Sequence, residues 1–406
     1  MQPEPIDDDA YRQKARRWLE TNAPAFAMPE DVVLDDRQEM EQARAWQRRL
    51  WEGGFAGIAL PTAFGGMGGT AAQAAIFSEE ESRYRLPRGY IGIGVRMTLP
   101  TIARHGTQEQ MRRFAEPTLR GDIVWCQLFS EPSAGSDLAA LKTRAVRDGD
   151  SWIVTGQKLW SSWAQHAGWG ILIARTDPDV PKHKGLTFFV VDMASSGIKI
   201  RPIRQISGHA DFNETFFEEV CIPDQCRIGA PGEGWACAMT VLANERMAPA
   251  DEGKDSNVTD LLALVGTSTA GNAAPLYHGA AHLAIAQAYA DECAGRLFSA
   301  RLRAMLTEGQ DPGVLSSVVK LAYGARMQKM TGLAMEIQGL AGIAPAPDND
   351  RALNFMKDYI WSAALRIAGG TDEVLRNQIA ERILGMPGDI RPDKEVPFSR
   401  SGAAPV

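Results

Sequence analysis

Two short stretches of the sequence carry the residue types of a ligand site. The first is Phe129-Ser130-Glu131-Pro132-Ser133-Ala134-Gly135-Ser136-Asp137, and the second is Gly156-Gln157-Lys158-Leu159-Trp160-Ser161-Ser162. Serine hydroxyls and the backbone N–H groups of a turn can hydrogen-bond phosphates and the polar edge of a ring, while an indole can cover its flat face. Either stretch alone is a weak signal. Their order and spacing together predict a site for a planar cofactor that carries phosphates.

The residues before these stretches have the pattern of helices. Asp7–Asp9 can begin a helix, and Thr107-Gln108-Glu109-Gln110 has the form of a capping box. A glycine-rich loop within 61–69 separates the helical segments, and it lacks the G-x-G-x-x-G spacing of a dinucleotide-binding loop. We therefore expect residues 1–121 to form an N-terminal helical domain.

From about residue 122 the pattern changes to short runs of β-forming residues with turn residues between them. Asp148-Gly149 is a hairpin signal in this region. The runs that we expect to be strands are Trp152–Val154, Gly170–Ala174, Leu186–Val191 and Ile198–Ile203. Several short strands of this kind predict a small β-sandwich or barrel, which we place at residues 122–230.

Helical periodicity returns after this region, and we expect a C-terminal helical bundle over residues 231–392. The expected helices cover 234–250, 277–305, 314–340, 352–366 and 372–384. Residues 261–290 contain no charged residue, but polar residues and Pro275 interrupt them, so we expect a loop leading into a buried helix rather than a membrane span. Residues 393–406 are expected to be a frayed tail. The whole pattern predicts an α+β fold in three parts.

Composition narrows the class of protein. The 406 residues carry a net charge of −7, which argues against a nucleic-acid-binding protein. The five cysteines include no C-x-x-C pair, and we expect reduced thiols in a cytoplasmic protein. Residues 1–10 are acidic and lack the apolar segment of a secretory signal. His278 and His282 lack the glutamate of an H-E-x-x-H motif, so we predict no metal site.

Motifs along nearly the whole chain resemble those of the flavin-dependent acyl-CoA dehydrogenases. They are Gly54…Pro61…Gly65-Gly66…Gly68, His105-Gly106-Thr107…Gln110, Ser130-Glu131-Pro132…Ala134-Gly135-Ser136-Asp137, Gly156-Gln157-Lys158…Trp160 and Gly370-Thr371…Glu373-Val374…Arg376. The resemblance implies an N-terminal helical domain, a middle β domain and a C-terminal four-helix bundle, usually in a tetramer. It also implies FAD bound between the middle and C-terminal domains, an acyl-CoA substrate and an electron-transfer flavoprotein as partner.

The same resemblance implies roles for individual residues. The expected FAD contacts are Leu128, Phe129, Ser130, Gly135, Ser136, Trp160, Ser161, Ser162, Gly370, Thr371 and Glu373. Among them, Ser130 would hydrogen-bond the polar edge of the isoalloxazine ring, and Trp160 would pack against the flavin. Ser136 would lie near both the FAD phosphates and the pantetheine arm of the substrate. Gly370, Thr371 and Glu373 match a loop that closes over the cofactor.

The position of the catalytic base departs from the commonest family pattern. Desaturation of an acyl-CoA removes an α-proton and a β-hydride, so it needs a carboxylate base beside the flavin. Many members carry this base directly before the Gly-Thr of the C-terminal loop, where this chain has Gly369. In a branch resembling isovaleryl-CoA dehydrogenase, the base precedes an arginine on the first helix of the C-terminal domain, and Glu245-Arg246 match that pair. We expect Glu245 to be the base and Arg246 to help hold the CoA end of the substrate. The alternative is a solvated Glu-Arg pair on a helix face.

A second departure concerns the FAD contacts between subunits. The Arg-x-Gln/Thr-Phe-Gly motif that serves them in the family is absent from 290–320. Together with Gly369 it supports a second hypothesis, a flavin-binding partner subunit of a heteromeric acyl-CoA dehydrogenase. A third is a flavin oxidase or monooxygenase on the same fold. The resemblance extends to bacterial members that act on bulky CoA esters, including sterol side chains, so both a homotetramer and a heterotetramer stay open.

Overall fold

The computed structural model describes residues 7–27, 35–87, 89–247, 256–268, 278–308, 310, 313–346, 349–391 and 393–400. Contacts between residues group the chain into two compact units, each assembled from separate stretches. The helical unit contains Met1–Leu34, Thr70–Leu86 and Pro249–Gly388. The sheet unit contains Asp35–Gly69, Pro87–Ala248 and Asp389–Val406. The three expected domains, by contrast, follow one another along the sequence.

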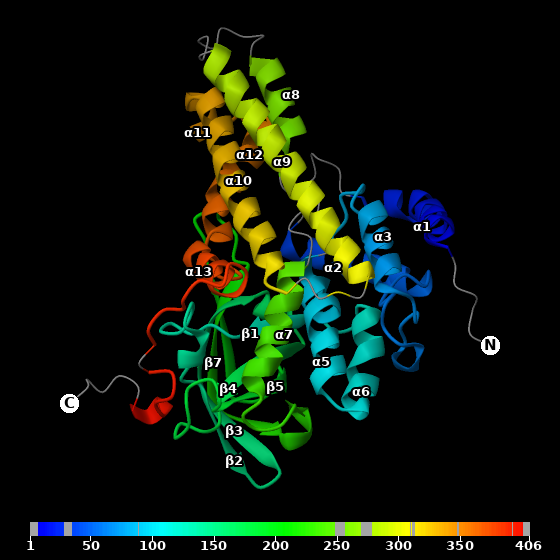
Figure 1. Ribbon diagram of the computed structural model, residues 1–406. Helices are drawn as coiled ribbons and strands as arrows, with labels where there is room; N and C mark the ends of the chain where they lie inside the picture. The colour runs from blue at the N-terminus through cyan, green and yellow to red at the C-terminus, as the bar shows by residue number, and fades with distance from the viewer. Residues whose placement is uncertain are drawn as a thin grey trace. The chain divides into compact units, whose positions relative to one another are not determined.

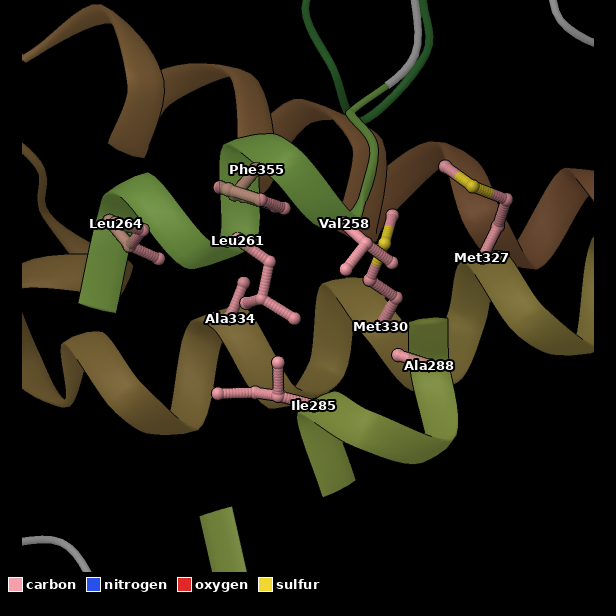
Figure 2. Close-up of a cluster of buried hydrophobic side chains, with 9 residues drawn as sticks. All are labelled: Val258, Leu261, Leu264, Ile285, Ala288, Met327, Met330, Ala334 and Phe355. Carbon is pink, nitrogen blue, oxygen red and sulfur yellow. The ribbon is translucent and has the colours of Figure 1, made fainter. Parts of the chain in front are cut away.

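The described part of the helical unit consists of helices and their connections (Figure 1). The helices are α1 Asp8–Asn22, α3 Ala71–Glu81, α8 Val258–Ser268, α9 His278–Thr307, α10 Leu315–Gln338, α11 Leu340–Ile343, α12 Asp350–Leu365 and α13 Asp372–Arg382. A cluster of buried apolar side chains joins α8, α9, α10 and α12. Figure 2 shows it, with Leu261 of α8, Ile285 of α9, Met330 of α10 and Phe355 of α12 among its members. These four helices therefore form a bundle around one apolar core. The sequence predicts a helical bundle in this region, but it does not predict α8 as a member.

Helix α8 corrects one expectation, because the sequence pattern predicts a loop there. Val258, Leu261 and Leu264 follow at intervals of three residues, and all three are buried in the bundle core. Carboxylates of neighbouring helices accept hydrogen bonds from the backbone at its start: Asp358 from Ser256 N at 2.7 Å and Glu292 from Val258 N at 3.1 Å. Contacts with the bundle thus stabilise this helix despite the turn-forming residues that follow it. Residues 269–277 of the expected loop lie outside the described residues.

The sheet unit combines one sheet with helices. The helices are α2 Asp36–Glu52, α4 Gly89–Gly92, α5 Leu99–His105, α6 Gln108–Leu119 and α7 Gly234–Met247. The strands are β1 Trp125–Leu128, β2 Arg144–Asp148, β3 Ser151–Ser162, β4 Trp169–Arg175, β5 Leu186–Asp192, β6 Ile198–Ile203, β7 Phe212–Pro223 and β8 Arg227–Ile228. Their order is β6-β7-β3-β2-β4-β5-β8, and β1 pairs in parallel with β4. Strands thus occupy the region where the sequence predicts the β domain.

The four predicted strands all lie within β3, β4, β5 and β6, but β1, β2, β7 and β8 were not predicted. The hairpin signal at Asp148-Gly149 joins β2 to β3, so the first strand of this hairpin precedes all of the predicted runs. Strand β7 pairs with β3 on one side and β6 on the other. Its polar residues and Glu219, at φ 53°, interrupt the apolar alternation that marks a strand.

The local sequence signals for helix starts agree with the structure better than the signals for strands. The predicted capping box begins α6: Thr107 Oγ1 accepts from Gln110 N at 3.2 Å, and Gln110 Oε1 accepts from Thr107 N at 2.8 Å. The predicted helix at 234–250 corresponds to α7, and residues 248–250 lie outside the described residues. Among the helices that the structure describes, none has the length and apolar character needed to cross a membrane.

Residues 393–400 differ from the expected frayed tail. Phe398 N donates to Val180 O at 2.9 Å, and Ser399 N donates to Pro178 O at 2.8 Å. Both acceptors lie in the connection between β4 and β5, so this part of the C-terminal segment is docked on the sheet unit. Residues 401–406 lie outside the described part of the chain.

Candidate functional site

The two predicted ligand-binding stretches lie side by side in the sheet unit. Residues 129–130 leave the end of β1 and run beside β3. Leu159 N donates to Ser130 O at 2.8 Å, and the Lys158 ammonium donates to Phe129 O at 2.9 Å. The structure therefore brings the two stretches together, which is what their joint use for one ligand requires.

A buried ion pair fixes this arrangement. Lys158 Nζ lies 2.9 Å from Glu131 Oε1, and the two side chains are 0% and 5% exposed. The Glu131 carboxylate also accepts from Lys142 N at 2.6 Å and from Thr143 N at 2.9 Å. Burial lowers the pKa of Lys158 to about 8. Burial acts to raise the pKa of Glu131, but the charge of Lys158 and the hydrogen bonds from Thr143 and Lys142 outweigh it and keep that pKa below its usual value. Both groups are therefore ionised at neutral pH.

Trp160 is held in an unusual backbone conformation. Its φ is 61°, and it lies in an irregularity of the β3–β7 pairing between Lys158 and Ser161. The left-handed region is unfavourable by about 1–2 kcal/mol for a residue with a Cβ atom, and such strain often marks a functional position. The indole is 54% exposed and packs edge-on against Phe212, with ring centroids 5.8 Å apart. The sheet unit thus presents an aromatic ring on its surface, one residue after Leu159, whose amide bonds the Ser130 carbonyl.

The turn that carries Ser136 is exposed. Glu131 and Ala134 exchange backbone hydrogen bonds of 3.0 and 3.1 Å across Pro132-Ser133, and proline suits the second position of such a turn. The next residues, 135–137, are exposed, and a Cβ atom placed on Gly135 would meet no atom within 4 Å. Backbone and hydroxyl groups of this turn are therefore accessible to a ligand.

The predicted FAD contacts in the sheet unit differ in how much of each side chain is exposed. The side chains of Leu128, Phe129 and Ser161 are buried, so these residues would contact a ligand through their backbone atoms. The Ser161 hydroxyl has no hydrogen-bond partner among the described residues. Ser130 and Ser162 are half-buried. An exposed indole beside an open turn of small residues fits a planar cofactor that carries phosphates.

The predicted C-terminal loop lies in the helical unit. Gly369 and Gly370 have φ values of 66° and 103°, which favour glycine. Lys320 Nζ donates to Gly370 O at 2.5 Å, and Thr371 Oγ1 caps α13 by accepting from Val374 N at 3.3 Å. Arg366 forms an ion pair with the buried Asp372 at the same place. Contacts of Lys320 with Gly370 and of Arg366 with Asp372 therefore fix the position of this loop. The Glu373 side chain is exposed.

The predicted base lies in the sheet unit. Glu245 is half-buried in the last turns of α7, a helix that packs against β5 and α5. The side chain of Arg246 lies outside the described part of the structure, so its predicted contact with CoA stays a prediction. Gly369 belongs to the helical unit and offers no side chain that could take a proton.

Two features of the site were not predicted. The pairing of Glu131 with Lys158 spans 27 positions, and no local pattern marks it. The buried Arg175 donates to Leu141 O at 3.1 Å and to Ala139 O at 2.6 Å, just beyond the Ser136 turn. A basic residue at the end of a strand is usually solvated, so its type and position alone did not indicate this role.

Comparison with known proteins gives relatives over most of the chain. Residues 6–122, 126–220 and 232–384 match the family models of the acyl-CoA dehydrogenase N-terminal, middle and C-terminal domains. Acyl-CoA dehydrogenase FadE34 of Mycobacterium tuberculosis is 42% identical over 323 residues, which is 79% of this chain but 43% of that protein. This chain thus spans less than half the length of FadE34. Acyl-CoA dehydrogenase IpdE1 of the same organism is 35% identical, and the alignment covers 95% of this chain and 99% of that protein.

Solved structures show the same fold. The Tcur3481-Tcur3483 steroid ACAD superimposes with a TM-score of 0.78 at 27% identity, covering 94% of this chain and 98% of that chain. The ChsE4-ChsE5 complex from Mycobacterium tuberculosis gives a TM-score of 0.74 at 26% identity, covering 96% and 100%. The predicted fold, with N-terminal helical, middle β and C-terminal helical parts, is confirmed by these matches.

Proposed function

Because this chain belongs to the acyl-CoA dehydrogenase family, whose members are oxidoreductases that act on CH–CH donors, we propose that it is an FAD-dependent enzyme that introduces an α,β double bond into an acyl-CoA thioester. The observation that carries this proposal is the pairing of the two ligand-binding stretches through Leu159 and Ser130, together with the exposed indole of Trp160. When bound, FAD supplies the acceptor for the β-hydride. In the helical unit we retain Gly370, Thr371 and Glu373 as proposed cofactor contacts.

We propose that Glu245 removes the α-proton. The main support is the backbone of Gly369, the position where many relatives carry the base. At φ 66° a glutamate at this position would have to adopt the left-handed backbone conformation, which is unfavourable by about 1–2 kcal/mol. Glu245 is the carboxylate that matches the alternative position, and its half-buried place at the end of α7 leaves part of the side chain accessible. Ser136 would hydrogen-bond the pantetheine arm, and Arg246 would hold the CoA end.

We propose a bulky acyl group, such as a steroid side chain, as the substrate. The support is the likeness to a steroid ACAD over 94% of this chain. We also propose an electron-transfer flavoprotein as the electron acceptor, on the ground of the family. We propose the cytoplasm as the location, because the five cysteines include no C-x-x-C pair. Assembly with a second dehydrogenase chain is supported by large exposed apolar side chains in the helical unit: Leu283, Leu297, Leu340, Ile343 and Trp361.

Anaerobic reduction of the bound flavin tests the proposed activity. The purified chain should carry FAD, and its visible absorbance should bleach when a suitable acyl-CoA is added. A panel of short, branched, aromatic and steroid-bearing CoA esters would identify the acyl group. We expect the steroid-bearing esters to bleach the flavin fastest. An FAD-loaded protein that no ester in the panel bleaches would contradict the proposed activity.

Gly369 also favours a second candidate, a flavin-binding partner subunit in a heteromeric dehydrogenase. This candidate predicts a colourless protein that gains flavin only when it is co-expressed with a neighbouring dehydrogenase chain. A yellow protein that bleaches on its own excludes this candidate. Rapid reoxidation of the reduced flavin by air would instead indicate an oxidase or monooxygenase on the same fold.

A further inference from the structure

The docked C-terminal segment, residues 393–400, is fixed to the sheet unit by backbone and side-chain contacts. We call this segment the C-terminal brace. Its Phe398 and Ser399 amides donate to the β4–β5 connection, and Pro397 forms a β-bridge with Pro181. The Ser399 hydroxyl adds a hydrogen bond of 3.0 Å to Asp179 Oδ1. These contacts give the brace a defined position, although its sequence predicts no regular element.

The ring of Phe398 covers a buried cation. The Arg175 Cζ atom lies 3.5 Å from the centroid of the Phe398 ring, which is a cation–π contact. The guanidinium beneath it donates to the carbonyls of Ala139 and Leu141 and, at 3.1 Å, to the carbonyl of Lys182. Burial lowers the pKa of Arg175 to about 10, so the group keeps its charge at neutral pH. Arg175 therefore connects the brace to the residues that directly follow the Ser136 turn.

A second cation makes a parallel connection. Lys182 Nζ lies 2.8 Å from Asp137 Oδ2 and 2.8 Å from Asp393 Oδ2. Asp137 belongs to the exposed turn and Asp393 to the brace, so one ammonium group joins the two. The Lys182 side chain is largely buried, while both aspartates are about half exposed. Screening by water is therefore weaker at the lysine than at a fully exposed pair.

We propose that the C-terminal brace sets the position of the Ser136-Asp137 turn through Arg175 and Lys182, which makes these two cations positioning residues for the phosphate-bearing ligand of that turn. The identity of this ligand rests on the proposed function. Without the Phe398 ring, water would compete with the carbonyls of Ala139 and Leu141 for the guanidinium. Without Asp393, Lys182 would lose one of its two fixed partners.

Hydrogen exchange in the ligand-free protein tests the brace independently of any flavin. Two amides report on the turn: Ala140 N bonds Asp137 O at 3.0 Å, and Leu141 N bonds Leu138 O at 3.1 Å. In Phe398→Leu, which keeps an apolar side chain but loses the ring, we expect these amides to exchange about fivefold faster. Phe398→Tyr, which keeps the ring, should exchange like the wild type.

Matched references make the outcome specific. The amides of Lys142 and Thr143 bond the Glu131 carboxylate and should not change in either variant. In Asp393→Asn we expect about twofold faster exchange at Ala140 and Leu141, because the contact is only partly shielded from water. Glu395→Gln, an exposed change within the brace, should have no effect.

A second measurement concerns the ligand. The dissociation constant of FAD should rise several-fold in Phe398→Leu and stay unchanged in Phe398→Tyr. If no variant binds FAD, the proposed function fails, while the exchange result still decides the role of the brace. The proposal is overturned if the Phe398 and Ser399 amides exchange faster in Phe398→Leu but those of Ala140 and Leu141 do not. It is also overturned if Glu395→Gln has the same effect as Asp393→Asn.

Discussion

Replacing Lys158 with methionine should destabilise the sheet unit strongly, although the two side chains have similar length. The change removes the ammonium group that lies 2.9 Å from Glu131 Oε1 and leaves a carboxylate that is 5% exposed. Removing one member of a buried ion pair costs about 3–5 kcal/mol, because the remaining charge has lost its partner without regaining water. Two backbone N–H groups still bond the carboxylate, so the lower half of this range applies. We expect the free energy of unfolding to fall by about 3–4 kcal/mol.

The complementary change is Glu131→Gln, which leaves the Lys158 ammonium buried with the Phe129 carbonyl. The new amide group offers one oxygen where Lys142 N and Thr143 N both need an acceptor. An unpaired buried donor costs about 1–3 kcal/mol, and the ammonium has lost its countercharge as well. The double variant removes both charges of this pair. It should therefore be more stable than the sum of the two single changes predicts, by at least about 2 kcal/mol.

Urea unfolding followed by tryptophan fluorescence measures these effects. Eight of the ten tryptophans belong to the sheet unit, among them Trp125, Trp152 and Trp169 on its strands, so the signal reports mainly on the unit that contains the pair. A transition for the helical unit, followed separately, should not shift. Single variants that lose less than about 1 kcal/mol, or a double variant that equals the sum of the singles, would refute the interpretation of a buried, mutually dependent pair.

Three further predictions concern other parts of the molecule. Trp160→Gly should be more stable than Trp160→Ala by about 1 kcal/mol, because only glycine adopts the left-handed backbone at φ 61° without strain; chemical unfolding measures this difference. Both variants should bind FAD more weakly than the wild type, which a flavin titration measures. Leu261→Ala should cost about 2–5 kcal/mol by opening a cavity in the bundle core (Figure 2), seen in the transition of the helical unit alone. The hydrogen bond from Arg227 lowers the pKa of Asp224 to about 2. The ionised Asp224 carboxylate therefore stabilises the folded protein fully above the pKa that Asp224 has in the unfolded chain, and this stabilisation is lost as the pH falls through its folded pKa. Asp224→Asn should therefore cost about 1–2 kcal/mol at pH 6, and urea titrations should show this difference vanish between about pH 4 and pH 2.

The sequence predicted which stretches meet but not what holds them together. The residues of 129–137 and 156–162 are small and polar, and such residues next to strands indicate a ligand site. Nothing local indicates that Lys158 is buried, because lysine is among the residues most often exposed. Its burial depends on Glu131, 27 positions away, and on the register of β3 with β7. Long-range pairing of this kind requires the fold to be known first.

The conformation of Trp160 shows a second limit. Aromatic residues favour extended strands, and no glycine or asparagine at this position signals a left-handed backbone. The irregular pairing between Lys158 and Ser161 imposes φ 61° on a residue that would otherwise extend the strand. The resemblance predicts that Trp160 contacts the flavin. Its strain is visible only in the structure.

Helix α8 and residues 393–400 were both mispredicted for one reason. Each is short, and each gains most of its stability from contacts with distant residues rather than from local propensity. α8 buries Leu261 against the bundle, and the C-terminal brace places Phe398 over Arg175. In contrast, the capping box at Thr107 was predicted correctly, because all of its hydrogen bonds lie within four residues.

The assignment of Glu245 as the base is tested most directly by the rate of anaerobic flavin reduction in Glu245→Gln. The assay uses an acyl-CoA that reduces the wild-type flavin. Glu218→Gln, which removes an equally charged side chain from an exposed pair with Lys199, serves as the control. We expect Glu245→Gln to bind FAD normally and to reduce it about 10²–10⁴-fold more slowly, while Glu218→Gln matches the wild type. Reduction at the wild-type rate in Glu245→Gln would contradict the assignment.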